Sequence, residues 1–254
     1  MTLTHNERAN ADKMFAAMDG ILVDHDEASV DVHFNPHFVQ HNPWALDGAA
    51  HVKEMCEYQF PLVSKRWVAQ GDLAGYHGYY GTPNPLGETP LVCFDLWRVR
   101  GDRIIEHWDA LMPVPDEAAA DALTAGGGDG AAEVSDAEVA LNMAEARRFL
   151  EVGVRSGDGA VIDELLTNDF VYHTATGEAS AADAKARIGD GQPLTINQVV
   201  ASGDLVVAHV HFTGDEPNVT WDIFRMTDGK IAEMWSLHQP IAPPEEQANT
   251  HPHF

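Results

Sequence analysis

The feature that most constrains this sequence is a stretch of 15 residues that occurs twice. The first copy, DLWRVRGDRIIEHWD, covers residues 95–109, and the second, DIFRMTDGKIAEMWS, covers residues 222–236. Each copy is typical of a strand, a two-residue turn and a second strand, because the Gly-Asp and Asp-Gly pairs tolerate the positive φ of a tight hairpin. A chain that carries this hairpin twice is expected to fold as two similar halves.

Two further blocks repeat in the same order. Residues 67–77 match residues 199–209, and residues 38–41 match residues 170–173, both at a spacing of 132 positions, whereas the hairpins are 127 positions apart. The second copy is therefore five residues shorter, and we place the missing residues in the loop 83–90, where a deletion is tolerated. Three blocks in one order predict a duplicated unit of about 110 residues.

Hydrophobic periodicity gives the order of elements within each half. In the first half, helical spacing predicts helices over residues 7–22 and 48–61, and residues 64–112 alternate with the period of an antiparallel meander. In the second half, the pattern predicts helical segments over residues 139–154 and 161–166, again followed by strands. Each half is thus predicted to contain helices followed by an antiparallel meander.

Composition divides the chain into four segments. We expect a first domain over residues 1–115, a linker over 116–136, a second domain over 137–242 and a C-terminal tail over 243–254. The linker combines an alanine-rich run with the sequence GGGDG, so we expect no packed element there, although part of the alanine run can be helical. The tail is expected to be flexible and polar.

The chain is strongly acidic, with 15 basic against 40 acidic residues and a formal net charge of −25. Such a surface repels phosphate backbones and anionic lipid, so we expect neither a nucleic-acid nor a membrane partner. It suits a salt-rich cytoplasm, where counterions screen the repulsion; the alternative is an ordinary acidic enzyme. The chain has no run of roughly 18 apolar residues, no apolar leader and no disulfide framework, so we expect a cytoplasmic protein.

Four short motifs of the first half, taken together, resemble the SnoaL-like polyketide cyclase family of the nuclear-transport-factor-2-like (NTF2-like) superfamily. They are FVQHNP at 38–43, GDL at 71–73, DLWR at 95–98 and EHWD at 106–109. The second half keeps GDL, DIFR and the Glu-x-Trp pattern.

The resemblance implies the α+β fold class, with two tandem cone-shaped NTF2-like domains, in each of which helices pack on a curved antiparallel sheet around an apolar pocket. Because members of the family dimerise through their sheets, it also implies an internal pseudo-dimer, with self-association beyond it possible. The superfamily includes cyclases, isomerases, dehydratases, epoxide hydrolases and transport domains, so the fold does not determine the function.

Two aspartates, Asp95 and Asp222, stand inside apolar strands at matching positions of the two copies. A buried carboxylate is disfavoured unless it is paired or its pKa is raised, and a raised pKa suits an acid or base that works near neutral pH. The position also resembles that of the family's acid–base aspartate. The alternative is a structural aspartate that pairs with Arg98 or Arg225.

His41 and His173 follow apolar pairs at the mouth of each expected cone, where they can shuttle a proton or donate to a substrate; the alternative is a loop histidine bonded to backbone. His107 is a further catalytic candidate. However, a two-residue turn would place Asp95 opposite Trp108 and turn His107 to the other face of the sheet. A β-bulge or a longer loop would reverse this facing.

Aromatic and histidine side chains complete the candidate pockets, although such residues are more often core. The residues that we expect to contact a flat, apolar ligand are Trp44, Trp97, Tyr79, His77, Tyr172, His211 and His238. Two histidines two apart on a strand, such as His209 and His211, can bind a metal, but no third ligand stands at a suitable spacing. We therefore expect no metal and no cofactor.

These residues predict a cofactor-independent enzyme that transfers protons on a small apolar carbonyl compound, by aldol-type cyclisation, isomerisation or hydration. The alternative is a non-catalytic carrier or assembly domain. We expect the first pocket to be the catalyst, because Met234 and Ser236 stand in the second copy where the first has His107 and Asp109.

Overall fold

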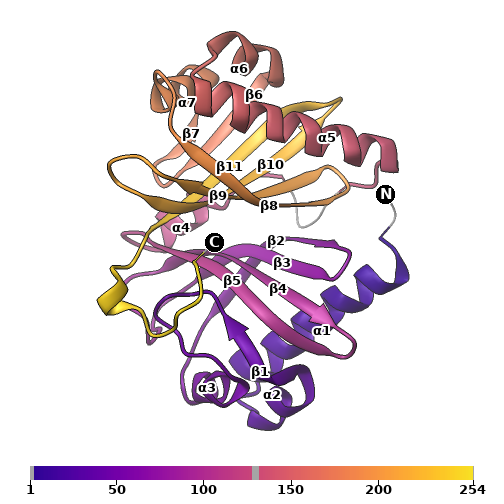
Figure 1. The fold of residues 1–254 in the computed structure, drawn as a ribbon, viewed down its shortest axis with the longest axis vertical. Coiled ribbons are helices and arrows are strands. Elements are labelled where there is room, and N and C mark those ends of the chain that lie inside the picture. Colours follow the sequence, from indigo (N-terminus) through magenta and orange to yellow (C-terminus); the bar gives the residue numbers. More distant parts are fainter. Residues whose placement is uncertain (1–2, 128–131, 254) are drawn as a thin grey trace.

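The computed structural model of the protein, which describes residues 3–127 and 132–253, has four layers (Figure 1). Two sheets lie face to face in the middle, and helices cover the outer face of each. The elements of the first half are α1 (His5–Leu22), α2 (Glu27–His33), β1 (Phe34–Gln40), α3 (Ala49–Glu54), the 3-10 turn η1 (Met55–Glu57), β2 (Leu62–Gln70), β3 (Leu73–Tyr80), β4 (Leu91–Arg100), β5 (Arg103–Pro113) and α4 (Glu117–Leu123). Those of the second half are α5 (Asp136–Arg148), the π-helical segment η2 (Phe149–Val154), α6 (Gly159–Leu165), β6 (Leu166–Thr174), β7 (Gly177–Ala179), α7 (Ala181–Ile188), β8 (Leu194–Ser202), β9 (Leu205–Phe212), β10 (Asn218–Thr227), β11 (Lys230–Pro240) and the 3-10 turn η3 (Pro244–Glu246).

The two sheets have the same strand order. The first is β1-β5-β4-β3-β2, and the second is β6-β11-β10-β9-β8 with β7 added beside β6. In each sheet the first strand pairs parallel with the last, and the remaining pairs are antiparallel. The predicted α+β class is confirmed, and the layout fits two tandem NTF2-like domains. The loop before β10 covers residues 213–217 and the loop before β4 covers 81–90, so the five-residue difference lies where the sequence predicted it.

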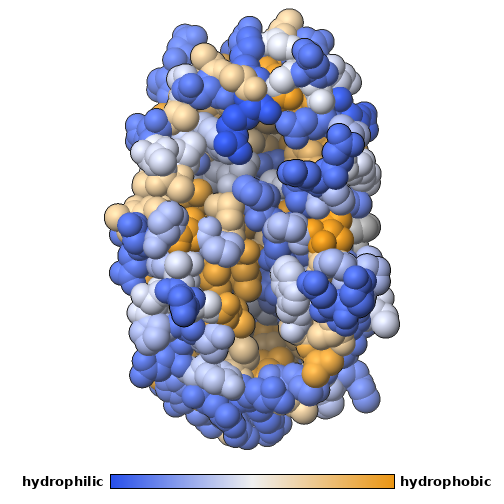
Figure 2. All heavy atoms as spheres, turned by 90° about the vertical axis from the view of Figure 1, so that its left-hand side faces the viewer, coloured by the Kyte–Doolittle hydropathy of each residue, from blue (hydrophilic) through white to orange (hydrophobic). Residues whose placement is uncertain are grey.

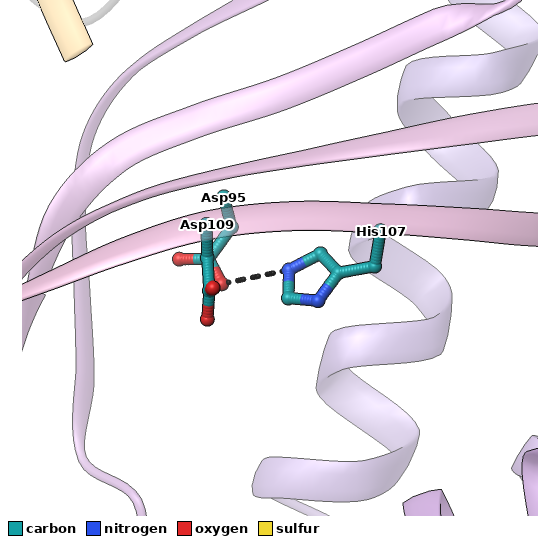
Figure 3. Close-up of side chains that lie close together, drawn as sticks. All are labelled: Asp95, His107 and Asp109. Carbon is teal, nitrogen blue, oxygen red and sulfur yellow. Dashed lines mark hydrogen bonds and ion pairs between the residues drawn. The ribbon is translucent and has the colours of Figure 1, made fainter. Parts of the chain in front are cut away.

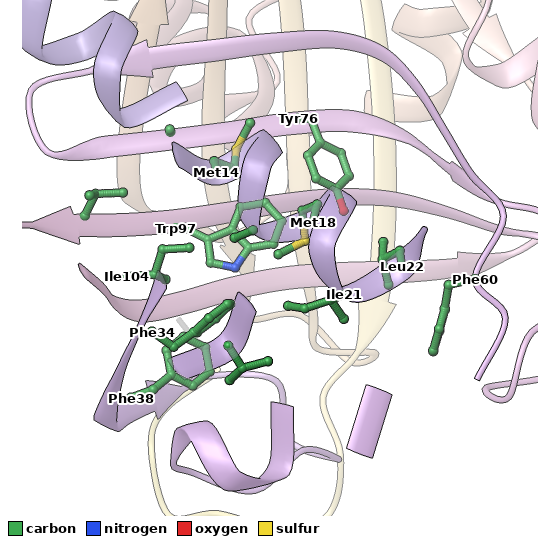
Figure 4. Packing of buried hydrophobic residues seen from close by; sticks show 14 of the residues in the cluster. Met14, Met18, Ile21, Leu22, Phe34, Phe38, Phe60, Tyr76, Trp97 and Ile104 are labelled. Carbon is green, nitrogen blue, oxygen red and sulfur yellow. The ribbon is translucent and has the colours of Figure 1, made fainter. Parts of the chain in front are cut away.

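Helix α1 shows how the sequence covers the sheet. Thr4 and Glu7 form a capping box in which each side chain accepts from the other's backbone N–H, a cap worth about 1 kcal/mol. Apolar side chains at helical spacing, Met14, Met18 and Ile21, are all buried against the outer face of the first sheet, the face that lines the cone interior (Figure 4). The helix thus forms where it was predicted and closes one side of the cone interior.

The opposite faces of the two sheets pack on each other. Phe94 and Trp221 meet there with ring centroids 4.7 Å apart. The hydroxyl of Ser202 accepts from the Ala69 N–H at 2.8 Å and donates to the Ala69 carbonyl at 2.7 Å, so β2 and β8 are joined by polar contacts as well. The predicted internal pseudo-dimer is confirmed by this sheet-to-sheet core.

The segment 116–136 is more ordered than the sequence predicted. Helix α4 buries Ala120 and Leu123 in the core between the sheets. Arg66 donates from Nη2 to the carbonyl oxygens of residues 124–126. The prediction of no packed element was wrong because small alanine side chains let a short helix enter the space between the sheets. Residues 128–131, with most of the glycine run, lie outside the described residues.

The described part of the C-terminal segment, residues 243–253, is not a free tail. Asn249 donates from Nδ2 to the carbonyl oxygens of Asn42 and Ala45, at 2.7 and 2.8 Å, and His253 is buried. The prediction of a flexible end was wrong, because these contacts fix the segment against the first half (Figure 1). Asn42 belongs to the site described below.

The sequence analysis did not foresee three short elements, α2, β7 and α7, and it extended the helix at 48–61 beyond its observed end. Hydrophobic periodicity is hard to detect in elements of only three to eight residues. The boundaries of the short helices are set by local caps instead. In α7, for example, Ser180 and Asp183 form a capping box. Among the described residues, no helix has both the length and the apolar character needed to cross a membrane.

Candidate functional site

A β-bulge decides which residues meet at the centre of the first half. The β4–β5 hairpin turns at the predicted dipeptide, but its register shifts between Arg98 and Val99. Asp95 therefore lies opposite Asp109, and not opposite Trp108 as a regular hairpin would place it. The bulge is the alternative that the sequence left open. It brings His107 onto the face of Asp95, because the extra residue of a bulge reverses the facing of those beyond it.

Asp95, His107 and Asp109 form a buried cluster in the cone interior (Figure 3). The His107 Nε2 atom lies 3.2 Å from Asp95 Oδ1, and one nitrogen or oxygen atom from each residue lies within 4.8 Å of the others. Burial raises the pKa of the Asp109 carboxyl to about 6, with the charge of Asp95 raising it further and that of His107 opposing the rise. Asn42 donates from Nδ2 to Asp109 at 2.9 Å.

The hydrogen bonds of Gln40 determine the tautomer of His107. Gln40 Oε1 accepts from the backbone N–H of Asn42 at 3.0 Å, and the same oxygen lies 3.0 Å from His107 Nδ1. Because an amide oxygen only accepts, Nδ1 must carry a proton. A neutral ring would then direct the Nε2 lone pair at the Asp95 carboxylate. The short contact is therefore favourable only when a proton or another cation lies between Nε2 and Asp95.

Two tyrosines that the sequence analysis missed lie beside this cluster. The Tyr80 hydroxyl lies 3.5 Å from Asp95 Oδ2 and 2.6 Å from the Tyr76 hydroxyl. Burial raises the pKa of both phenols well above the usual value, so both stay protonated near neutral pH. The alternation of side chains along the strand is the feature that could have indicated these tyrosines. Tyr76 pairs with Asp95 across β3 and β4, so the two side chains lie on the same face of the sheet.

His77 and Tyr79 point the other way, toward the second sheet. His77 Nδ1 lies 2.5 Å from Arg66, and burial together with that guanidinium lowers the pKa of His77 well below its usual value. The Tyr79 hydroxyl donates to Asp121 on α4 at 3.2 Å. The structure thus places neither residue at the Asp95 cluster, because alternation sends both to the face that packs on the other half.

His41 and His173 have matching environments that differ from the predicted one. His41 stacks on Trp108 with ring centroids 4.7 Å apart, and its Nε2 lies 2.9 Å from Glu106. His173 stacks on Trp235 at 4.8 Å and likewise contacts a glutamate at 2.9 Å. Both rings lie on the side of the inter-sheet core, away from the Asp95 cluster. Their shared role is to tie the end of β1 or β6 to the neighbouring strand.

The predicted tryptophans have different positions. Trp97 stacks on His107 with centroids 4.7 Å apart, so it forms part of the wall of the cluster. Trp44 is 51% exposed and follows Asn42 in the loop after β1. Its backbone N–H donates to Asn42 Oδ1 at 2.9 Å, which helps to orient the amide that contacts Asp109.

In the second half, Asp222 borders a cavity of about 330 Å³. Burial raises the pKa of Asp222 to about 6, against the hydrogen bond donated by Ser236. Of the candidate residues, Tyr172 and His238 lie on the cavity wall, whereas His173 and His211 are not among its lining residues within the described part of the chain. The lining residues are Val154, Tyr172, Ala184, Arg187, Ile188, Gln192, Phe212, Asn218, Thr220, Asp222, Met234, Ser236 and His238.

Comparison with known protein families finds one model that matches part of the second half. Residues 146–234 match the SnoaL-like domain. No curated protein matches the chain.

Similar solved structures each correspond to less than half of the chain. A candidate ketosteroid isomerase from Kribbella flavida is 21% identical, with a TM-score of 0.37, over 42% of this chain and 84% of that one. An LEH-like epoxide hydrolase from M. tuberculosis is 18% identical, with a TM-score of 0.34, over 40% and 85%. IdmH, a candidate polyketide cyclase from Streptomyces antibioticus, is 18% identical, with a TM-score of 0.35, over 38% and 91%.

Proposed function

We propose that the protein is a cofactor-independent enzyme of the SnoaL-like type that transfers protons on a small, largely apolar carbonyl compound. The observation that carries the proposal is the buried cluster of Asp95, His107 and Asp109. It combines a carboxylate–imidazole pair whose atoms lie 3.2 Å apart with a second carboxyl whose pKa is raised to about 6. A raised carboxyl pKa suits a group that gives or takes a proton near neutral pH.

Each group has a distinct role in this proposal. Asp95, ionised beside a protonated His107, removes a proton from the carbon next to the carbonyl group. The Tyr80 hydroxyl and protonated Asp109 donate hydrogen bonds to the oxygen on which negative charge develops. The proton then returns to another atom of the substrate, or the carbanion attacks a second carbonyl. These outcomes correspond to isomerisation and aldol-type cyclisation, and proton transfer to a double bond with addition of water corresponds to hydration.

The surroundings of the cluster favour an apolar substrate. Trp97, Met18, Leu22 and Phe60 belong to the core cluster of the first half, on the same face of the sheet as Asp95. Figure 2 shows a hollow in the lower half of the molecule, the half that contains the first sheet in Figure 1, with hydrophobic side chains on its floor. A hydrocarbon body would bury apolar surface there and leave its carbonyl group to the polar cluster.

The test is solvent proton exchange. A panel of small cyclic ketones in D₂O would be followed by NMR for loss of the protons next to the carbonyl, with the wild type, Asp95→Asn and the matched variant Asp222→Asn. Loss of general-base catalysis predicts a decrease of about 100-fold or more in Asp95→Asn. Asp222→Asn should retain exchange. Equal loss in both variants, or loss only in Asp222→Asn, would contradict the proposal; an unchanged far-UV circular dichroism spectrum with a cooperative thermal transition would exclude misfolding.

A non-catalytic carrier is the second candidate. The observation that favours it is the cavity of the second half, where Met234 replaces the imidazole that partners the aspartate in the first half. Tight ligand binding without turnover, unaffected by Asp95→Asn, would support the carrier over the enzyme.

A further inference from the structure

The cavity beside Asp222 is separate from the cluster of Asp95, His107 and Asp109. All its lining residues belong to the second half, whereas the cluster lies on strands of the first sheet. Its volume of about 330 Å³ falls at the lower end of the range for small-molecule sites. Asp222 is buried at its inner end, whereas Arg187 and His238 are exposed at its rim. The cavity is thus open to solvent at a positively charged side chain and carries a buried carboxyl group inside.

The first half provides an internal comparison, because its strands have the same register. Tyr76 pairs with Asp95, whereas Ala208 pairs with Asp222, so a smaller side chain opens space beside the second aspartate. In addition, four positions that are apolar in the first half are polar or charged on the cavity wall. The pairs are Met55 and Arg187, Leu91 and Asn218, Cys93 and Thr220, and Leu111 and His238. The second interior is therefore both larger and more polar than a copy of the first would be.

Arg187 places a positive charge on the wall of the cavity. Its guanidinium lies 5.6 Å from the ring centroid of Tyr172 on the wall. Its positive charge lowers the pKa of His238, after the larger effect of burial, and also opposes the raised pKa of Asp222. Arg187 forms no ion pair among the residues that the structure describes. In a chain with 40 acidic and 15 basic residues, an arginine directed at a cavity indicates an anionic ligand group.

We propose that the cavity of the second half binds a small organic carboxylate whose carboxylate group pairs with Arg187 and whose hydroxyl group donates to Asp222. Asp222 already accepts from Ser236, and an ionised carboxylate has further lone pairs that can only accept. A hydroxyl is the ligand group that satisfies them. Between the two ends, Val154, Ile188 and Phe212 offer apolar surface to a ring or short hydrocarbon body. This proposal does not depend on catalysis in the first half.

Three probes that share one benzene ring separate the contributions of the carboxylate and of the hydroxyl: 4-hydroxybenzoate, benzoate and phenol. Isothermal titration calorimetry at pH 7.5 and low salt should give the tightest binding for 4-hydroxybenzoate. Removal of the charge-assisted contact in Arg187→Met, which introduces the residue of the first half, should weaken both carboxylates about tenfold and leave phenol unchanged. Arg147→Met, at an exposed position of α5 outside the cavity, is the matched control and should bind like the wild type.

The Asp222 end has its own variant. Asp222→Asn should lower the affinity for 4-hydroxybenzoate to about that for benzoate. Absence of binding by all three probes would overturn the proposal, as would phenol binding as tightly as 4-hydroxybenzoate. Unchanged affinities in Arg187→Met would also overturn it, provided that the melting temperature shows the variant to be folded.

Discussion

The carboxyl of Asp222 should make the stability of the protein depend on pH in a way that Asp222→Asn removes. Burial raises its pKa from 3.8 to about 6 in the folded state, whereas the unfolded chain has the ordinary value. Between these values the folded protein binds the extra proton, so unfolding becomes easier as pH rises. The full effect corresponds to about 3 kcal/mol, complete above pH 6 and absent below the unfolded pKa.

The assay is urea unfolding of the wild type and Asp222→Asn at pH 5 and pH 7.5. Roughly half of this effect lies within this window, so the wild type should lose about 1 to 2 kcal/mol more than the variant as pH rises. The lower pH stays above the sequence pI of about 4.6. The comparison cancels the general repulsion among carboxylates, since both proteins share it. A difference in unfolding free energy that does not change with pH would refute the reasoning.

Three other predictions follow from the charge, the inter-sheet core and the C-terminal segment. The melting temperature should rise from millimolar to molar potassium chloride, because salt screens a net charge of −25; a flat or falling curve would remove the salt-adapted interpretation. Residues 1–115 and 137–242, expressed apart, should self-associate or aggregate through the exposed sheet face, which gel filtration would detect; two well-behaved monomers would contradict this. Asn249→Ala should lower the free energy of unfolding by about 1–3 kcal/mol in urea titrations, since it leaves the carbonyl groups of Asn42 and Ala45 without these donors; an unchanged value would show that the segment is not held by this residue.

The candidate site shows how far the sequence could lead. Asp95 and Asp222 were recognisable because each interrupts an apolar strand, and burial of both is what makes them notable. His107 could not be assigned to a face, since a single extra residue in β5 reverses it and no local signal marks that bulge. Tyr76 and Tyr80 were missed because the neighbouring residues His77 and Tyr79 are equally plausible functional residues by residue type. Which pair points inward depends on the sheet's contacts, not on its composition.

The observed positions of His41 and of the C-terminal segment differ from the expected ones for a related reason. His41 was expected in the pocket, but a ring at the end of a strand can turn to either side. Stacking on Trp108 and the contact with Glu106 decide the side that it takes. The composition of the C-terminal residues indicates a flexible segment. The contacts that hold it are made by Asn249 with the carbonyl groups of Asn42 and Ala45, more than 200 positions away along the chain, so local sequence could not reveal them.

The sequence by itself predicted two similar halves, the position of each hairpin and the place of the five-residue difference. These features depend on local turn chemistry and on periodicity, which neighbouring residues express without help from the rest of the chain. The tertiary structure alone decided the bulged register, the Asp95–His107 contact, the docking of the C-terminal segment and the cavity beside Asp222. Each of these results from packing between segments far apart in the sequence, where one residue of register or one smaller side chain changes which groups meet.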